Sequence, residues 1–337
     1  MKHRIGFQPL FLLAFWGFNL PTLADTLREH ALVDPLQSQS GSYTSIVSAL
    51  KAAPDNATSP WVIRLKAGHY AEKIIVNKPN IHIIGEGKNN TVISYNAYAG
   101  QHLIGSSDTW GTRRSATVTV QAKGFHAQNL TIENNFDWPG NDALEKNSPH
   151  KIKQTQAVAL MLGHGNDQAL FNNVSLKGYQ DTLFINSGRS LFYRSSISGN
   201  IDFIFGAGQA LFVQSDIITR ARADKRKTAG IITAPSTDIT NGLGFVFYQC
   251  KLLKEPGVPA NSTWLGRPWH PTTVFKDGRY ADPNAIGASM FIDTYMDNHI
   301  AESGWTSMNG TQRNGKKTLA FKPENSRFYE HNNHGPG

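Results

Sequence analysis

Two aspartates in the middle of the chain lie next to apolar residues that this residue type usually avoids. Asp181 begins DTLF, and Asp202 begins DFIF 21 residues further on. If the two carboxylates are neighbours in space, both cannot ionise cheaply, so one pKa rises while the other stays low. Such a pair supplies an acid and an anion, which suits glycoside hydrolysis or acyl transfer with a carboxylate nucleophile. A single aspartate could instead cap a turn through backbone hydrogen bonds, but a periodic pair favours chemistry.

Amide and guanidinium side chains near the pair favour acyl transfer. Gln180 directly precedes Asp181, and Gln156 lies 24 residues before Gln180, in QAVAL. Amide donors beside a carboxylate suit the stabilisation of a developing oxyanion, whereas a buried glutamine that satisfies only backbone groups is the alternative. Arg267 in WLGRPWHPTT could hold one carboxylate ionised through a bidentate pair, although most arginines are simply exposed.

Three aromatic residues close to these motifs offer flat apolar faces of the kind on which sugars stack: Trp269, Phe205 and Tyr179. Aromatic residues of a repetitive β-structure belong more often to its core, which weakens the assignment more for Phe205 than for Trp269. The twelve histidines show no HExxH-like spacing, and a lone cysteine cannot form a CxxC pair. We therefore expect no metal and no other cofactor.

An internal repeat predicts the scaffold that would hold these residues. Leu-Phe pairs recur at positions 170, 191 and 211, in the segments ALFNNVSL, SLFYRSSI and ALFVQSDI, and a diluted copy, GFVFYQCKL, starts at Gly244. NLTI at Asn129 precedes NVSL at Asn173 by 44 residues, which we interpret as about two periods. Each unit consists of short alternating runs punctuated by Gly and Asn, without helical periodicity.

A period near 21 residues, built from strands, predicts one coil of a parallel β-helix per repeat. Equivalent residues of successive coils then stack about 4.8 Å apart, which makes Asp181 and Asp202 neighbours. Leucine-rich repeats have a similar repeat length, but their Leu-x-Leu-x-x-Asn signature is missing here, and the blades of a β-propeller need about twice the period. A β-sandwich with a chance similarity is the remaining alternative. We expect an all-β, single-stranded parallel β-helix whose long loops form a substrate cleft. The segment 134–153 is expected to be a long loop, and the sequence leaves open whether it walls the cleft.

Composition and the N-terminal segment indicate an exported globular protein. The chain has 337 residues, of which 39% are hydrophobic and 17% charged, so it is not disordered. Residues 1–24, MKHRIGFQPLFLLAFWGFNLPTLA, are typical of a secretory signal peptide, followed by one domain over 25–337. A retained membrane anchor is the alternative, but Pro21 and the short apolar stretch argue against it.

The charge balance favours a polyanionic partner. The formal net charge of +8 becomes +6 once Lys2 and Arg4 leave with the leader, and fixed positive charge raises the local concentration of anionic ligands. Nucleic acid is the weaker candidate, because RARADKRK at 220–227 is the one dense basic run. Cys250 is the only cysteine, so it forms no intramolecular disulfide and is expected to be a small buried residue.

Four motifs together resemble a known family. QAVAL, GYQDTLF, GNIDFIFG and LGRPW, in this order and spacing, closely resemble the motifs of pectin methylesterases, carbohydrate esterase family 8. The likeness continues through TWGTRRSATVTV, TAPST, GRPWHPTTVFKDGRYADPNAIG and MDNHI, so it covers nearly the whole mature chain, and it is strongest to the bacterial plant-pathogen branch. The resemblance implies a right-handed parallel β-helix that removes methyl esters from polygalacturonate without a metal.

By motif position, the resemblance also implies a role for each residue of the site. Asp202 corresponds to the nucleophile that attacks the C6 ester carbonyl, and Asp181 to the acid that protonates departing methanol and then activates water. Gln156 and Gln180 match the oxyanion donors, and Arg267 matches the residue that keeps Asp202 ionised. Substrate-groove positions are implied at Trp269, Thr272, Met308 and Arg222, the last suited to a free galacturonate carboxylate.

One position departs from the family pattern. Related bacterial enzymes can bridge adjacent coils with a cysteine pair beside this site, where the aligned residues here are Ser195 and Ser215. The missing bridge removes a clamp of about 2–4 kcal/mol and leaves the catalytic set whole.

Three other functions stay open on the sequence: a pectin depolymerase of polygalacturonase or lyase type, a non-catalytic carbohydrate-binding or adhesive β-helix, and an esterase that acts on acyl thioesters. The paired glutamines and Arg267 count against a depolymerase, and the complete catalytic set counts against a non-catalytic protein. We expect a monomer, secreted or periplasmic, that acts on methyl-esterified pectin without nucleic-acid or membrane partners.

Overall fold

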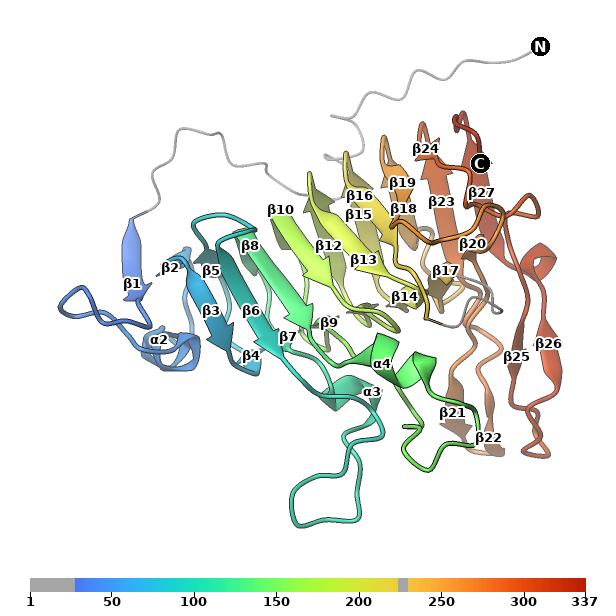
Figure 1. Cartoon of the computed structure of the whole chain (residues 1–337), viewed down its shortest axis with the longest axis horizontal. Coiled ribbons are helices and arrows are strands. Elements are labelled where there is room, and N and C mark those ends of the chain that lie inside the picture. Colours follow the sequence, from blue (N-terminus) through green and yellow to red (C-terminus); the bar gives the residue numbers. More distant parts are fainter. Residues whose placement is uncertain (1–27, 224–229) are drawn as a thin grey trace.

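The computed structural model describes residues 28–223 and 230–337, so the predicted leader over 1–24 lies outside the described residues. Within them the chain winds into successive coils along the long axis of the molecule (Figure 1). Strands of neighbouring coils pair in parallel, and they form two long ladders of 16 and 7 strands. This architecture is a parallel β-helix, as the repeat predicts. No helix in these ranges is long and apolar enough to cross a membrane.

The coils present three faces. The first face carries β1 (Glu29–Val33), β2 (Trp61–Leu65), β5 (Ile81–Ile84), β8 (His126–Asn134), β10 (Ala169–Lys177), β12 (Arg189–Tyr193), β15 (Gln209–Val213), β18 (Phe245–Tyr248), β23 (Ala288–Ile292) and β27 (Arg327–His331). The second face carries β3 (Gly68–Ala71), β6 (Thr91–Tyr95), β13 (Ser196–Gly199), β16 (Asp216–Thr219), β19 (Lys251–Lys254) and β24 (Tyr295–Met296), and it is joined to the first by β8 and β10, which continue around the corner. The third face carries β4 (Ile74–Val76), β7 (Val118–Val120), β9 (Leu160–Leu162), β11 (Leu183–Ile185), β14 (Ile201–Gly206), β17 (Gly230–Pro235) and β20 (Thr263–Gly266).

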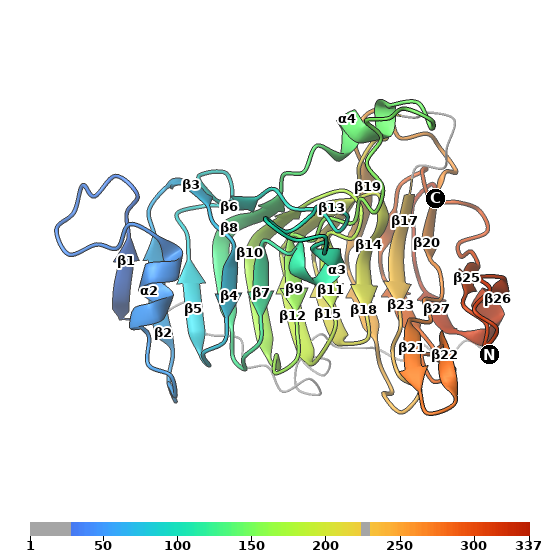
Figure 2. The ribbon, with the colours of Figure 1, turned by 90° about the horizontal axis from the view of Figure 1, so that it is seen from below.

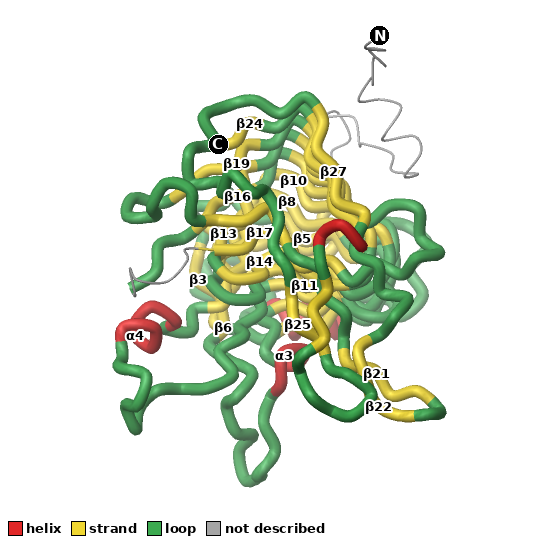
Figure 3. The backbone as a smooth tube through the Cα atoms, turned by 90° about the vertical axis from the view of Figure 1, so that its right-hand side faces the viewer, coloured by secondary structure: helices red, strands yellow, loops and turns green. Residues whose placement is uncertain are grey.

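Short helices and hairpins extend from this body. The helical segments are α2 (Ile46–Ala52), α3 (Gly111–Arg114), α4 (Trp138–Ala143) and η1 (Pro323–Asn325), and the hairpins are β21 (Thr272–Phe275) with β22 (Gly278–Ala281) and β25 (Met308–Gly310) with β26 (Leu319–Phe321). In Figure 2, α3 lies in front of β9 and β11 of the third face, and the β21–β22 hairpin lies further along the same side. Figure 3, along the long axis, shows α3 and both hairpins on one side of the stacked coils. These excursions wall the cleft described below.

The Leu-Phe repeat has the register that the sequence predicts. Leu170 pairs with Leu191, and Leu191 with Leu211, on three successive coils. The phenylalanines that follow them point inward and stack through the core, with ring centroids 4.6 Å apart for Phe171–Phe192 and 4.8 Å for Phe192–Phe212. The stack continues to Phe247 and Phe291 on one side, and on the other side Phe125 packs against Phe171 with its ring tilted by 52°. Each ring therefore adds stacking, worth about 0.5–1.5 kcal/mol, to the gain from burial.

The predicted number of coils between Asn129 and Asn173 is wrong. Asn129 and Asn173 were expected about two periods apart, but Leu130 pairs directly with Val174, so the two asparagines lie on adjacent coils. The extra length is a long excursion between β8 and β9, which contains α4 and thus is not wholly a loop. Both asparagines have positive φ at the corner between the first two faces, a conformation that Asn tolerates. Asn173 Nδ2 donates to Asn129 Oδ1 at 2.7 Å.

Ser195 and Ser215 stand where related bacterial enzymes can have a cysteine pair. Each lies at the corner between the first and the second face of its coil. Ser195 and Ser215 lie on adjacent coils, and the Ser195 backbone N–H donates to Ser215 Oγ at 3.1 Å. Each hydroxyl also donates to a phenylalanine carbonyl of the preceding coil, that of Phe171 or Phe192. Cys250 follows in the same row, is buried, and has its pKa raised to about 12 by burial. It is therefore the small structural residue that the sequence predicts.

Candidate active site

The two aspartates meet on the third face. Leu183 pairs with Ile204 and Phe184 with Phe205. Asp181 lies two residues before Leu183 and Asp202 two residues before Ile204, so the two aspartates lie on adjacent coils. Both have positive φ, 65° and 49°, and the pairing of β14 shifts between Ile201 and Ile204. A shift of this kind re-aims a side chain that would otherwise follow the strand alternation. Phe203 is fully buried in the core while Asp202 faces the cleft.

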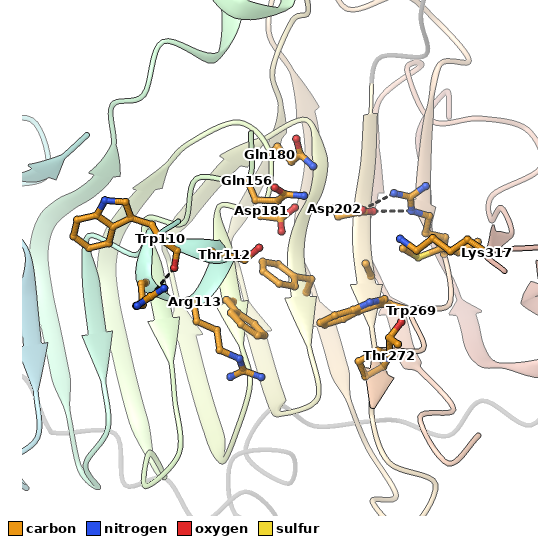
Figure 4. A pocket seen from close by; sticks show the side chains of 18 of the residues that line it. Trp110, Thr112, Arg113, Gln156, Gln180, Asp181, Asp202, Trp269, Thr272 and Lys317 are labelled. Carbon is orange, nitrogen blue, oxygen red and sulfur yellow. Dashed lines mark hydrogen bonds and ion pairs between the residues drawn. The ribbon is translucent and has the colours of Figure 1, made fainter. Parts of the chain in front are cut away.

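Arg267 binds one carboxylate and not the other. Its Nε donates to Asp202 Oδ1 at 2.9 Å and an Nη to Oδ2 at 2.5 Å, a bidentate pair (Figure 4). The arginine is positioned by the strand that ends at Gly266, and its own N–H donates to the carbonyl of Thr233. A bidentate guanidinium pair is both stronger and more directional than a single hydrogen bond. It therefore fixes the orientation of the Asp202 carboxylate.

Burial and charge distinguish the two aspartates. Asp181 and Asp202 are 8% and 9% exposed, and burial raises the pKa of both carboxyls. At Asp202 the charge and the hydrogen bonds of Arg267 oppose burial, although they do not cancel it. The pKa of Asp181 lies well above its ordinary value, because the negative charge of Asp202 adds to burial and Arg267 offsets only part of both. The pair therefore holds its shared proton on Asp181, while Asp202 carries the negative charge.

The two glutamines line the same cavity from adjacent coils. The backbone N–H of Ala157 donates to the carbonyl of Gln180 at 3.1 Å, which aligns the QAVAL segment with the GYQDTLF segment. Figure 4 shows the amide nitrogens of Gln156 and Gln180 turned to the side of Asp202. Two amide donors above a carboxylate form the arrangement that binds a developing oxyanion.

Aromatic rings form the floor of the cleft. Phe184 and Phe205 stack with centroids 4.3 Å apart and interplanar angle 13°, and Trp269 stands edge-on to Phe184 at 6.3 Å. Phe205 is only 4% exposed, yet it packs outside the β-helix core with Phe184 and Trp269. The sequence left open whether Phe205 faces the core or the cleft, and the structure places it in the floor of the cleft. Tyr179 does not line the cavity and instead stacks on Trp138.

The cavity has a volume of about 990 Å³, at the upper end of the usual range for small-molecule sites. Five cationic side chains line it against two acidic ones, Asp181 and Asp202. Besides Arg267, the cations are Arg113 and Arg114 in α3, Arg279 on β22, and Lys317 just before β26. Arg113 lies over the Phe184 ring at 5.1 Å and donates to Asn186 Oδ1. The sequence motif TWGTRRSATVTV contains two of these arginines, but no sequence pattern indicated that they line the same cavity as Asp202.

The predicted groove residues divide into two groups. Thr272 and Met308 line the cavity together with Trp269, from the two hairpins and the turn before them. Arg222 does not line it; its Nη donates to Asp142 Oδ1 at 2.9 Å in a pair whose side chains are only 11% and 5% exposed. The segment 134–153 likewise contributes no lining residue. A role for Arg222 in binding a galacturonate carboxylate stays a prediction.

The described ranges contain no group of three or more His, Cys, Asp or Glu side chains placed to hold a metal ion. A carboxyl pair with amide and guanidinium neighbours, in a basic cleft with an aromatic floor on a parallel β-helix, is the arrangement expected of a β-helix hydrolase.

Comparison with known proteins gives the particular family. The chain belongs to the Pectinesterase family, whose model matches residues 35–337. It is 47% identical over 311 residues to pectinesterase A of Dickeya dadantii, covering 91% of this chain and 84% of that protein. The structures of a pectin methylesterase from Erwinia chrysanthemi and of a pectin methylesterase in complex with a hexasaccharide each match with TM-score 0.88 and 46% identity, covering 92% of this chain and 90% of the other. The resemblance noted in the sequence is thereby confirmed.

Proposed function

We propose that this chain hydrolyses the methyl esters of the C6 carboxyls of pectin, with Asp202 as nucleophile and Asp181 as acid and base. The observation that carries the assignment of roles is the contact of Arg267 with Asp202 alone. A guanidinium on one member of a carboxyl pair keeps that member anionic and leaves the proton on the other. The membership of the Pectinesterase family supports the ester and the acidic polysaccharide as substrate.

The first half of the reaction forms an acyl-enzyme. The Asp202 carboxylate attacks the ester carbonyl carbon, and the tetrahedral oxyanion accepts hydrogen bonds from the amides of Gln156 and Gln180. As the carbon–methoxyl bond breaks, Asp181 transfers its proton to the methoxyl oxygen, and methanol leaves. Because the pKa of Asp181 is raised by burial and by Asp202, the proton is present at the pH where Asp202 is ionised.

The second half returns the enzyme to its initial state. Asp181, now a carboxylate, removes a proton from a water molecule that attacks the galacturonyl carbon of the mixed anhydride. The bond to Asp202 breaks, Asp202 regains its negative charge beside Arg267, and the sugar carboxyl is released as the acid or carboxylate. The same two glutamines stabilise the second oxyanion. One water is consumed and one methanol is formed for each ester.

The charge of the cleft supports a polyanionic substrate. With the proton on Asp181, the five cations and the Asp202 carboxylate that line the cavity leave a net formal charge of +4. Each turnover creates a galacturonate carboxylate, so the product becomes more complementary to the cleft than the substrate. Pectin with some free carboxyls should therefore bind more tightly at low salt than fully methylated pectin.

We further propose that the chain reaches its substrate by export through the leader at 1–24 and then acts as a monomer. The charged N-terminus and the following apolar stretch of the leader support export.

Asp202→Ala provides the direct test, with methanol and reducing ends measured together on methylated pectin. We expect methanol release to fall by at least three orders of magnitude, with no reducing ends from either protein. Asp55→Ala is the matched control, because the Asp55 side chain is 85% exposed and lies outside the cleft; it should keep the parent rate. Methanol release by Asp202→Ala at the parent rate contradicts the nucleophile, and formation of reducing ends by the parent protein indicates a depolymerase.

A further inference from the structure

The amide of Gln180 must be held in one of two orientations for the proposed function to work. An amide group has a similar shape when rotated by half a turn, but only its nitrogen donates a hydrogen bond. With the nitrogen toward Asp202, Gln180 stabilises an oxyanion, whereas with the oxygen there it would repel one. Side-chain rotation of this kind is therefore equivalent to loss of the donor, which in an oxyanion site costs about 100- to 1,000-fold in kcat.

One side chain outside the set of catalytic residues engages this amide. Thr155 Oγ1 donates to Gln180 Oε1 at 2.8 Å. The amide oxygen is thus satisfied on the side away from the reacting groups, and Figure 4 shows the nitrogen of Gln180 turned to the side of Asp202. The reversed orientation would bring the amide oxygen toward the Asp202 carboxylate, which would repel the partial negative charge of that oxygen. The hydroxyl of Thr155 and the charge of Asp202 therefore favour the same orientation.

The backbone around Thr155 is fixed on both sides. The N–H of Gly100 donates to the carbonyl of Gln154, and that of Ala99 donates to the carbonyl of Gln156. On the other side, the N–H of Ala157 donates to the carbonyl of Gln180. A β-branched side chain on a fixed backbone has few χ1 choices. Thr155 therefore presents its hydroxyl to Gln180 without a large loss of conformational entropy.

The second glutamine lacks an equivalent support. Gln156 Oε1 is buried and has no hydrogen-bond partner among the described residues. The two amide donors therefore differ, and loss of the Thr155 hydroxyl should affect Gln180 alone.

We propose that Thr155 is a positioning residue for catalysis, which selects the donor orientation of the Gln180 amide. The inference rests on the proposed role of Gln180 in binding the oxyanion. The affected quantity is kcat, because the oxyanion exists in the transition state and not in the bound ester. A neutral hydrogen bond of this kind contributes about 0.5–1.5 kcal/mol, which corresponds to about a two- to thirteenfold change in rate.

The experiment compares Thr155→Val, Thr155→Ser, Gln180→Ala and the double variant Thr155→Val/Gln180→Ala by methanol release from methylated pectin. Valine preserves the shape of threonine without its hydroxyl, and serine restores the hydroxyl without the methyl group. We expect Thr155→Val to lower kcat about two- to thirteenfold with KM within twofold of the parent value. Thr155→Ser should recover kcat to within twofold. In the Gln180→Ala background, Thr155→Val should cause no further loss.

Three results would overturn the proposal: a parent-like kcat in Thr155→Val, a loss of the same size when Gln180 is already absent, or a serine variant no better than the valine variant. A thermal unfolding curve for each variant separates folding from catalysis, since a purely structural role would lower Tm in both backgrounds. If Gln180→Ala itself keeps the parent kcat, the oxyanion role of Gln180 fails and the inference fails with it. If Gln180→Ala loses activity and Thr155→Val does not, the inference alone is refuted.

Discussion

Arg267 is the residue whose removal most directly tests the division of labour between the two aspartates. Its guanidinium donates two hydrogen bonds to Asp202, which is 9% exposed. Arg267→Ala leaves that largely buried carboxylate without its cationic partner, next to Asp181. The protonated form of Asp202 then becomes favoured to a higher pH, because the counter-charge that opposed burial is gone.

The size of the effect follows from the contact. Breaking a buried ion pair by removing one partner costs about 3–5 kcal/mol, and we take the lower end, about 3 kcal/mol, because water can enter the space that Arg267 vacates in an open cleft. At 1.36 kcal/mol for each tenfold change, the acid limb of the pH profile of kcat/KM should move up by about 2 pH units. The basic limb should also move up, because Arg267 lowers the pKa of Asp181 as well.

The assay is initial methanol release at subsaturating pectin across the pH range in which the parent and the variant stay folded, checked by circular dichroism. Arg267→Lys keeps the charge but loses the two-pronged geometry, so its acid limb should move by about half as much. Arg113→Ala is the matched control: this arginine lines the same cavity but contacts Phe184 and Asn186 rather than Asp202. It should raise KM and leave both limbs in place. Arg267→Ala with a uniformly lower rate and unmoved limbs would refute the reasoning.

Three further predictions concern stability and substrate binding. Because the pKa of Asp181 is raised, the folded state binds more protons than the unfolded state above about pH 4, and this group lowers stability as pH rises through its folded pKa. In urea unfolding, the free energy of unfolding of Asp181→Asn should therefore increase relative to that of the parent between pH 4 and 8. A difference that is constant with pH would contradict this. Phe212→Ala interrupts the core stack between Phe192 and Phe247 and should lower the free energy of unfolding by about 3–5 kcal/mol; a loss below 1 kcal/mol would show that the stack is not part of the cooperative core. Lys317→Ala removes one cation from the cleft, so it should raise KM for partly de-esterified pectin at low salt and leave KM nearly unchanged at high salt; an equal effect at both salt concentrations is the opposing result.

Much of the site could be predicted from the sequence because the scaffold is periodic. In a β-helix a residue one period away is a neighbour in space, so the step between DTLF and DFIF predicts the contact between two coils. The same reasoning predicts the ladder of Leu and Phe residues on the first face. It failed for Asn129 and Asn173, because the length of an excursion between strands does not change the number of coils.

Other features depend on segments that leave the coils. Arg279 and Lys317 reach the cleft from two hairpins, whose paths are determined by contacts between residues distant in sequence. Arg222 lies outside the cavity and pairs with Asp142, 80 residues away in the chain, a contact that no local pattern indicates. The support of Gln180 by Thr155 is of the same kind, since no motif distinguishes a hydroxyl that meets an amide from one that meets water.

The sequence by itself determined the chemical groups of the site, the coil on which each lies and the scaffold that stacks them, because these follow from residue type and a local period. Only the tertiary structure decided how the carboxylates are aimed, through positive φ at Asp181 and Asp202 and a shift in strand pairing. It also decided the two-pronged geometry by which Arg267 contacts Asp202, and which other cations line the cavity. The physical reason is that charge and hydrogen-bond energies depend on distances of a few ångströms between groups far apart in the chain, which no local pattern specifies.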